Sequence, residues 1–284
     1  MNAMLAAVPH YREIGSGPTV VCLHSSASSS LQWCQLGQEL SDRFRVVAVD
    51  LYGYGESPRW NGDRAHNLDD EVALIEPLLR RAGEPVHLVG HSYGGAVALR
   101  VALRHPEQVC SLTVYEPVAF SLLREAGVEH AAAREVCALR NAIDAQLAQG
   151  NPEAAARGFV DYWSGAGSFD QLTSERRARI AVVMHKVRQD FDALYGDSVP
   201  LAAYRQIQVP VLYLHGAASP RSTRHIAALL GLGMRQADVR ILDGVGHMGP
   251  VTQPERVNEL IEYFLEMIEG AAESGDVVAE SQVA

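Results

Sequence analysis

The chain has 284 residues, of which 48% are hydrophobic and 20% are charged, a balance that suits a globular protein with a sizeable core. This length fits one α/β unit that carries an insertion. The net charge of −10 disfavours nucleic acids and anionic membranes as partners, because phosphate binding requires a surplus of Lys and Arg.

The N-terminal segment MNAMLAAVPHYREIG has no basic region and no long apolar stretch, so we expect neither a signal peptide nor a membrane span, and a cytoplasmic protein. No pair among the cysteines has CxxC spacing, which argues against a zinc or redox site. We expect buried, reduced thiols at Cys22, Cys34, Cys110 and Cys137.

Six short apolar runs, rich in β-branched residues, predict strands along the chain. Their nearly continuous apolar character indicates that both faces of each strand are buried. Helical patterns separate several of them, which predicts an α/β fold with a mostly parallel sheet and helices on both faces. The expected strands cover residues 19–24, 44–50, 85–90, 110–116, 209–215 and 237–243.

The strongest local signal is the segment GHSYGG at residues 90–95, between a strand-like run and a helix-like run. A serine in this place lies on a very tight turn, where side chains at Gly90 and Gly94 would collide. The turn presents the Ser92 hydroxyl at the sheet edge, beside the amides of a helix N-terminus. We therefore predict Ser92 as a nucleophile; the alternative is a Gly-rich turn of another α/β fold.

Residues 118–205 contain no convincing strand pattern and predict a helical cap inserted into a core formed by 1–117 and 206–270. Helix-spaced apolar stripes run through Val136 to Leu147 and Ile180 to Leu194, and Asn151-Pro152 is typical of a helix start. Extra structural packing is a compatible alternative to a lid. Candidate pocket-lining residues are Phe159, Trp163, Met184 and Phe191, although each type more often belongs to a core.

The C-terminal part predicts one helix with an apolar face from Val257 to Ile268, with Pro254 in its first turn. The small, acidic tail 271–284 is expected to be disordered. His247, in the Gly-rich loop GVGHMG after the last strand, is a candidate base because imidazole exchanges protons near neutral pH. His91 is interpreted as a packing residue.

Four motifs in this order resemble the α/β-hydrolase superfamily over residues of about 8 to 269. HYREIGSGPTVVCLH resembles its opening hairpin and third strand, and the segment from Asp50 to Ser57 resembles its DxxGxGxS loop. GHSYGG resembles the nucleophile elbow, and Gly246-His247-Met248 resembles the loop of the catalytic histidine. The resemblance implies an α/β-hydrolase fold with a Ser–His–acid triad.

The same resemblance implies an oxyanion hole built from two backbone N–H groups. One is the amide of Tyr93, directly after the nucleophile. The other, by position, is the amide of Ser26 in the segment His24-Ser25-Ser26, where the family usually has His-Gly. Ser25 therefore occupies a position that the family gives to glycine.

The triad acid departs from the commonest pattern of the superfamily. Ser219 occupies the usual acid position after the penultimate strand, and a serine supplies no negative charge. Other members take the acid from the end of the preceding core strand, where this chain has Glu116 in a Tyr-Glu-Pro segment. Glu116 is the predicted acid, Asp243 is the alternative, and a surface or cap-anchoring role for Glu116 stays open.

Together these residues predict a serine hydrolase that cleaves a small carboxylic ester or thioester through an acyl-enzyme, with no metal or organic cofactor. A serine nucleophile excludes the related enzymes that require aspartate there. C–C bond hydrolysis, acyl transfer and perhydrolysis are alternatives, and a small-molecule receptor or binding module is the non-enzymatic one. The physiological substrate and the oligomeric state stay open.

Overall fold

The computed structural model describes residues 7–125 and 130–274, which form a seven-stranded sheet in the order β1-β3-β2-β4-β5-β6-β7. All neighbouring pairs are parallel except β1 with β3. The predicted fold class is confirmed, but β1 pairs with β3 and forms no hairpin with β2. The strands are β1 (Tyr11–Ile14), β2 (Thr19–Leu23), β3 (Arg45–Val49), β4 (Val86–His91), β5 (Val109–Tyr115), β6 (Val211–Gly216) and β7 (Ala237–Leu242).

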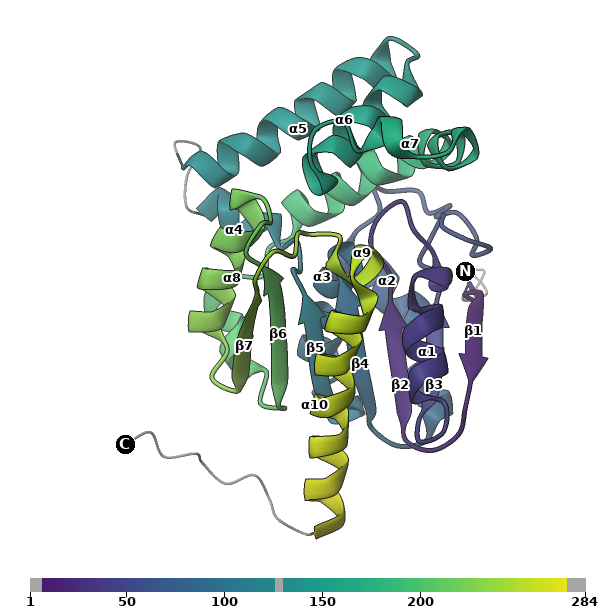
Figure 1. Cartoon of the computed structure of the whole chain (residues 1–284), viewed down its shortest axis with the longest axis vertical. Helices are drawn as coiled ribbons and strands as arrows, with labels where there is room; N and C mark the ends of the chain where they lie inside the picture. The colour runs from purple at the N-terminus through teal and green to yellow at the C-terminus, as the bar shows by residue number, and fades with distance from the viewer. Residues whose placement is uncertain (1–6, 126–129, 275–284) are drawn as a thin grey trace.

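Helices cover both faces of the sheet, with α1 and α10 in front and α2 and α3 behind in the view of Figure 1. Each face carries its own apolar cluster, because the nearly unbroken apolar strands direct side chains to both sides. The α-helices are α1 (Cys34–Leu40), α2 (Leu68–Ala82), α3 (Tyr93–Arg104), α4 (Phe120–Glu125), α5 (Ala131–Ala148), α6 (Pro152–Ser164), α7 (Ser174–Gly196), α8 (Arg221–Gly233), α9 (Gly249–Thr252) and α10 (Pro254–Ser274).

Strand β7, at the end of the described sheet, contradicts the expectation that every strand is buried on both faces. Its residues from Asp238 to Ile241 are exposed, and the side chain of Ile241 retains 61% of its accessible surface. A strand with only one neighbour in the sheet needs less apolar surface, and β7 accordingly alternates charged and apolar residues.

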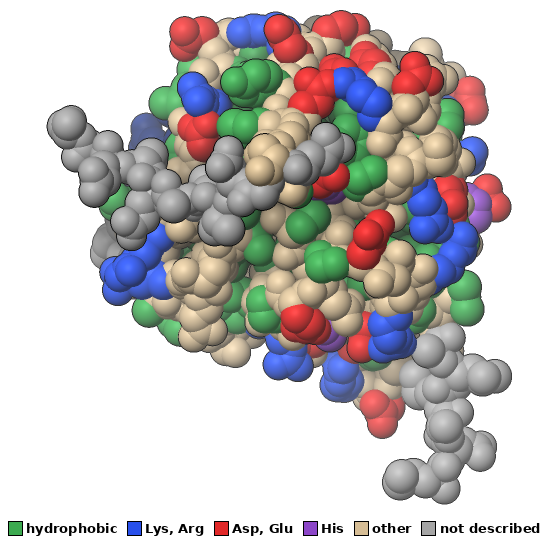
Figure 2. Space-filling model, turned by 90° about the horizontal axis from the view of Figure 1, so that it is seen from below, with side chains coloured by type: hydrophobic (Ala, Val, Ile, Leu, Met, Phe, Trp, Pro, Cys, Tyr) green, Lys and Arg blue, Asp and Glu red, His purple; other side chains and the backbone are tan. Residues whose placement is uncertain are grey.

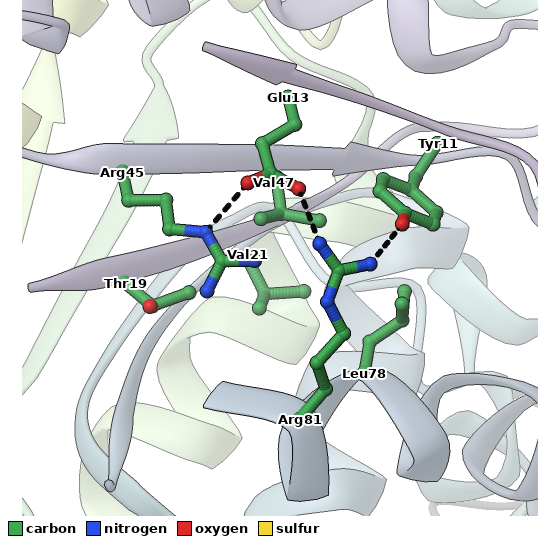
Figure 3. A pocket seen from close by; sticks show the side chains of 8 residues that line it. All are labelled: Tyr11, Glu13, Thr19, Val21, Arg45, Val47, Leu78 and Arg81. Carbon is green, nitrogen blue, oxygen red and sulfur yellow. Dashed lines mark hydrogen bonds and ion pairs between the residues drawn. The ribbon is translucent and has the colours of Figure 1, made fainter. Parts of the chain in front are cut away.

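Strand β1, at the other end, is held by ion pairs. Glu13 accepts hydrogen bonds from Arg45 of β3 at 2.7 Å and from Arg81 of α2 at 3.1 Å. Figure 3 shows its carboxylate between the two guanidinium groups in a pocket beside the sheet, with Arg81 also contacting the Tyr11 hydroxyl. The pairing lowers the pKa of Glu13, chiefly through Arg45.

Helices α5, α6 and α7 lie above the carboxyl ends of the strands (Figure 1). Between 118 and 205 the described residues contain helices and turns but no strand, as the apolar stripes predict. Helix α6 begins at Pro152 after Asn151, although the Asn151 side chain makes no capping hydrogen bond.

The expectations for the C-terminal tail and for the cysteines hold only in part. Helix α10 continues to Ser274, so 271–274 belong to it, whereas the rest of the expected tail, 275–284, lies outside the described residues. All four cysteines are free, but Cys34 is exposed and only Cys22 is fully buried.

The surface opposite helices α5, α6 and α7, seen from below in Figure 2, carries acidic and basic side chains interspersed with hydrophobic ones. Among the helices that the structure describes, none combines the length and the apolar character required to cross a bilayer.

Candidate active site

Ser92 lies on the tight turn between β4 and α3, with the positive φ of 55° and a ψ of −114°. Its amide donates to the Tyr115 carbonyl at 3.0 Å, which ties the turn to β5. A Cβ at Gly90 would lie 2.5 Å from the Gly94 carbonyl oxygen, and one at Gly94 would lie 2.4 Å from the Leu23 carbonyl oxygen. Both glycines are therefore sterically required, Gly90 by the turn itself and Gly94 by the close approach of β2.

His247 lies between the other two predicted side chains. Its Nε2 lies 3.0 Å from Ser92 Oγ and its Nδ1 lies 2.7 Å from Glu116 Oε2. All three residues are buried, with exposed fractions of 6% for Ser92, 1% for His247 and 0% for Glu116. The topology explains the meeting, because Ser92 follows β4, Glu116 follows the adjacent β5, and His247 lies in the loop after β7.

The carboxylate of Glu116 is placed to stay ionised. Burial alone would raise its pKa, but the hydrogen bonds with His247 and from the Gly216 backbone outweigh burial and lower the pKa below the ordinary value. The Gly216 N–H donates to the second carboxylate oxygen at 2.7 Å. Ser219 is buried beside the same carboxylate and helps to lower its pKa, but its hydroxyl makes no hydrogen bond of ordinary geometry.

The alternative acid lies elsewhere. Asp243 is exposed, and the contact recorded at this residue runs from Arg256 to its backbone carbonyl. Asp243 directly follows β7, whereas the partner within hydrogen-bond distance of His247 Nδ1 is Glu116. The geometry therefore favours Glu116 over Asp243 as the partner of the imidazole.

The loop after β2 carries Ser26, the residue expected to supply the second oxyanion amide. His24 anchors this loop: burial lowers its pKa, so its neutral ring donates from Nδ1 to the Ser25 carbonyl and accepts the Leu51 N–H at Nε2. The Gly94 amide donates to the His24 carbonyl at 3.1 Å, joining the loop to the helix that begins at Tyr93.

Backbone strain is concentrated in this region. Among the described residues, the non-glycine residues with positive φ are Ala27 at 57°, Ser92 at 55° and Glu116 at 45°. They lie in the loop of the expected oxyanion donor, at the expected nucleophile and at the expected acid. Such conformations cost about 1–3 kcal/mol each and are common at functional sites.

Trp163, one of the four candidate lining residues, contacts the site. Trp163 of α6 packs its ring on His247, with ring centroids 4.0 Å apart and planes inclined by 31°. Phe159 contacts Trp163 edge to face, whereas Phe191 packs on Phe120 and Met184 is wholly buried. Helix α6 therefore contacts the imidazole through the Trp163 ring, and the other three candidates are part of the buried apolar core.

Two supporting contacts were missed from the sequence. The His91 ring, interpreted as packing, donates from Nε2 to the His247 carbonyl at 2.9 Å, and burial lowers its pKa so that it stays neutral. The Tyr115 hydroxyl donates to the Gly246 carbonyl at 2.7 Å. Both fix the histidine loop from the ends of β4 and β5. Their positions next to Ser92 and Glu116 were the available signal.

The arrangement can be compared with known proteins. The alpha/beta hydrolase family profile matches residues 20–260. A hydrolase from Acinetobacter baylyi that is named for (E)-2-((N-methylformamido)methylene)succinate is 25% identical over 90% of this chain and 94% of its own. The pimeloyl-[acyl-carrier protein] methyl ester esterase of Aeromonas hydrophila is 41% identical, over 34% of this chain and 37% of its own.

The fold is similar to that of solved hydrolases as well. An esterase from Exiguobacterium antarcticum superposes with a TM-score of 0.75 at 20% identity, covering 94% of this chain and all of that one. At this identity the likeness concerns the fold. Because the family match spans most of the chain, this protein belongs to the alpha/beta hydrolase family.

Proposed function

We propose that this protein is a serine hydrolase that cleaves a small carboxylic ester or thioester through a covalent acyl-enzyme. The observation that carries the proposal is the hydrogen-bonded line from Ser92 Oγ through His247 to Glu116, with donor–acceptor separations of 3.0 and 2.7 Å. A nucleophile, a base and an orienting anion within hydrogen-bond reach are the parts that acyl transfer requires.

The chemistry follows from these positions. Ser92 Oγ attacks the carbonyl carbon while His247 Nε2 takes the hydroxyl proton, and Glu116 at Nδ1 stabilises the imidazolium. The amides of Ser26 and Tyr93 donate to the oxyanion of the tetrahedral intermediate. Collapse expels the alcohol or thiol, which receives the proton from His247, and water then repeats the sequence on the acyl-enzyme.

The cap, residues 118–205, selects the substrate in this proposal. Trp163 covers one face of His247, so the acyl or alcohol group approaches past an aromatic wall supplied by α6. Because the triad residues are almost completely buried, a substrate reaches Ser92 only along a path that the surrounding helices leave open.

A second candidate reaction comes from the Acinetobacter relative, whose match extends over the cap as well as the core. Hydrolysis of (E)-2-((N-methylformamido)methylene)succinate would use the same nucleophile and base. Turnover of this compound, measured beside short acyl esters and thioesters, decides between the two substrates.

The test of the proposed function combines labelling with turnover. The wild-type protein should take up one equivalent of a fluorophosphonate at Ser92 and hydrolyse p-nitrophenyl acetate. Ser92→Ala should lose labelling and at least about 1,000-fold in kcat, since removing a triad nucleophile costs orders of magnitude. An unchanged melting temperature controls for folding. A wild-type protein that is neither labelled nor active would point instead to a binding module of the same fold.

A further inference from the structure

A second buried polar cluster joins the cap to the core beside the candidate site. It consists of Lys186 and Asp190, one turn apart on α7, and Glu71 on α2. The side chains of Asp190 and Glu71 are almost completely inaccessible, and Lys186 forms ion pairs with both. The Lys186 ammonium also lies over the rings of Tyr54 and Tyr93, 5.0 and 4.9 Å from their centroids.

The cluster contacts both of the expected oxyanion donors through their side chains. The Ser26 hydroxyl donates to Asp190 Oδ2 at 2.6 Å, and the Tyr54 hydroxyl donates to the same oxygen at 2.5 Å. The Tyr93 hydroxyl donates to Glu71 Oε1 at 3.1 Å. Ser26, Tyr54 and Tyr93 belong to the core, whereas Asp190 belongs to the cap.

Each carboxylate in the cluster has partners on both oxygens. Asp190 Oδ1 accepts from Lys186 while Oδ2 accepts the two hydroxyls, and Glu71 Oε2 accepts the Tyr52 amide at 3.1 Å. Charge-assisted hydrogen bonds in a buried site are strong and directional. The Ser26 side chain is therefore held in one place only while α7 is seated against the core.

The loop has a reason to require such a tether. Ala27, next to Ser26, has a φ of 57°, which a residue other than glycine adopts at a cost. Ser25 occupies a position where the family usually has glycine, so the loop lacks the conformational freedom that a glycine would give it. A hydrogen bond from Ser26 to a fixed anion in the cap offsets the tendency of the loop to relax.

We infer that Asp190 is a positioning residue for the oxyanion hole: through Ser26 and Tyr54 it holds the loop after β2 in the conformation that aims the Ser26 amide at the reacting carbonyl. The oxyanion hole is therefore complete only when α7 is packed against the core. The inference rests on the proposed function, because it concerns transition-state stabilisation of acyl transfer by Ser92.

The test compares Asp190→Asn, Ser26→Ala and the double variant with p-nitrophenyl acetate as substrate. Each single variant should lower kcat about tenfold with little change in KM, since the amide remains but its aim is lost. The double variant should be no slower than the slower single variant, because both changes disrupt the same charge-assisted hydrogen bond. Inhibition by phenylboronic acid, which forms a tetrahedral adduct on serine, should weaken by the same factor as kcat falls.

Asp192→Asn is the matched control. Asp192 lies on the same helix and pairs with Arg140 and Arg188, with 45% of its side chain exposed. It should retain wild-type kcat and boronate inhibition. A comparable kcat loss in Asp192→Asn, or additive losses in the double variant, would assign the effect to general loosening of α7 and overturn the inference.

Two further outcomes separate this inference from the proposed function. An active wild type whose kcat and boronate affinity survive both Ser26→Ala and Asp190→Asn overturns the tether alone. A wild type that is not labelled by the fluorophosphonate overturns the proposed function. Should Asp190→Asn lack a cooperative melting transition, Ser26→Ala decides by itself, since it deletes only one hydroxyl: a tenfold loss supports the tether and unchanged kcat overturns it.

Discussion

Two buried polar groups lie close together in this molecule and differ in their construction. The line from Ser92 through His247 to Glu116 uses strand ends and loops of the core, with two of its residues in strained backbone conformations. The cluster of Lys186, Asp190 and Glu71 spans two helices, α7 and α2. Under the proposed function the first transfers a proton, whereas the second holds its charges in fixed positions. Residues with a strained backbone occur in the line and not in the cluster.

Among the changes that distinguish the line from the cluster, Glu116→Gln is expected to have the largest effect. An amide cannot stabilise the imidazolium, so kcat should fall about 100- to 10,000-fold while thermal stability changes little. Turnover of p-nitrophenyl acetate measures the loss. Asp243→Asn, at an exposed carboxylate, serves as the control and should stay within twofold of wild type. Severe loss in Asp243→Asn beside a near-normal Glu116→Gln enzyme would move the acid to Asp243.

Lys186→Met probes the second group through stability. It leaves two buried carboxylates without their common cation, and an uncompensated buried charge typically costs about 3–5 kcal/mol. The free energy of unfolding, measured with urea, should therefore fall by that amount. Arg188→Met, two residues along α7, breaks partly exposed pairs with Asp144 and Asp192 and should cost no more than about 1 kcal/mol. Equal losses would mean that the Lys186 cluster behaves as an ordinary surface network.

The pH dependence of folding sharpens the same contrast. Burial would raise the pKa of Glu71, but Lys186 and His66 outweigh it and lower the pKa from 4.5 to about 2. A depressed carboxyl pKa stabilises the fold fully above pH 4.5, and that stability disappears as the pH falls toward 2. Urea unfolding between pH 5 and pH 2 should be less steeply pH-dependent in Glu71→Gln than in the wild type. Equal slopes would show that Glu71 titrates normally.

The smallest effect is expected where Trp163 of α6 contacts the imidazole. Trp163→Leu removes the aromatic face over His247, which favours the imidazolium formed during catalysis by about 0.5–2 kcal/mol. The value of kcat should fall about 2- to 30-fold, and Trp163→Phe should recover part of it. Steady-state kinetics on both variants provide the measurement. Identical kcat values for the leucine and tryptophan proteins would limit Trp163 to packing.

Residues in local sequence patterns could be identified before the fold was known. Gly90 and Gly94 flank a serine between a strand and a helix, and a turn this tight leaves few residue types acceptable. His247 follows a strand in a Gly-rich loop. Such signals are local because steric limits act over a few neighbouring residues, which is why the fold class and the positions of Ser92 and His247 could be predicted.

Other features had no local signal. Strand β7 alternates charged and apolar residues, but this pattern does not show that the apolar Ile241 is exposed as well; the place of β7 at the end of the described sheet leaves it so. Lys186 and Asp190 interrupt an apolar helical stripe without any motif, and Glu71 is 115 residues from Lys186 in the chain. Packing of the helices brings partners so far apart in the chain together, because a buried charge is costly unless it is paired.

The sequence alone determined the turn at Ser92, the loop of His247 and the alternation of strands and helices, since each depends on sterics and periodicity within a short segment. The tertiary structure decided which carboxylate faces the imidazole, because β5, which precedes Glu116, lies beside the strand of Ser92, whereas β7, which precedes Asp243, does not. It also decided that Asp190 of α7 meets Ser26 of the loop after β2, across 164 residues of chain. Contacts of that range depend on how helices and sheet pack, and no short stretch of residues encodes them.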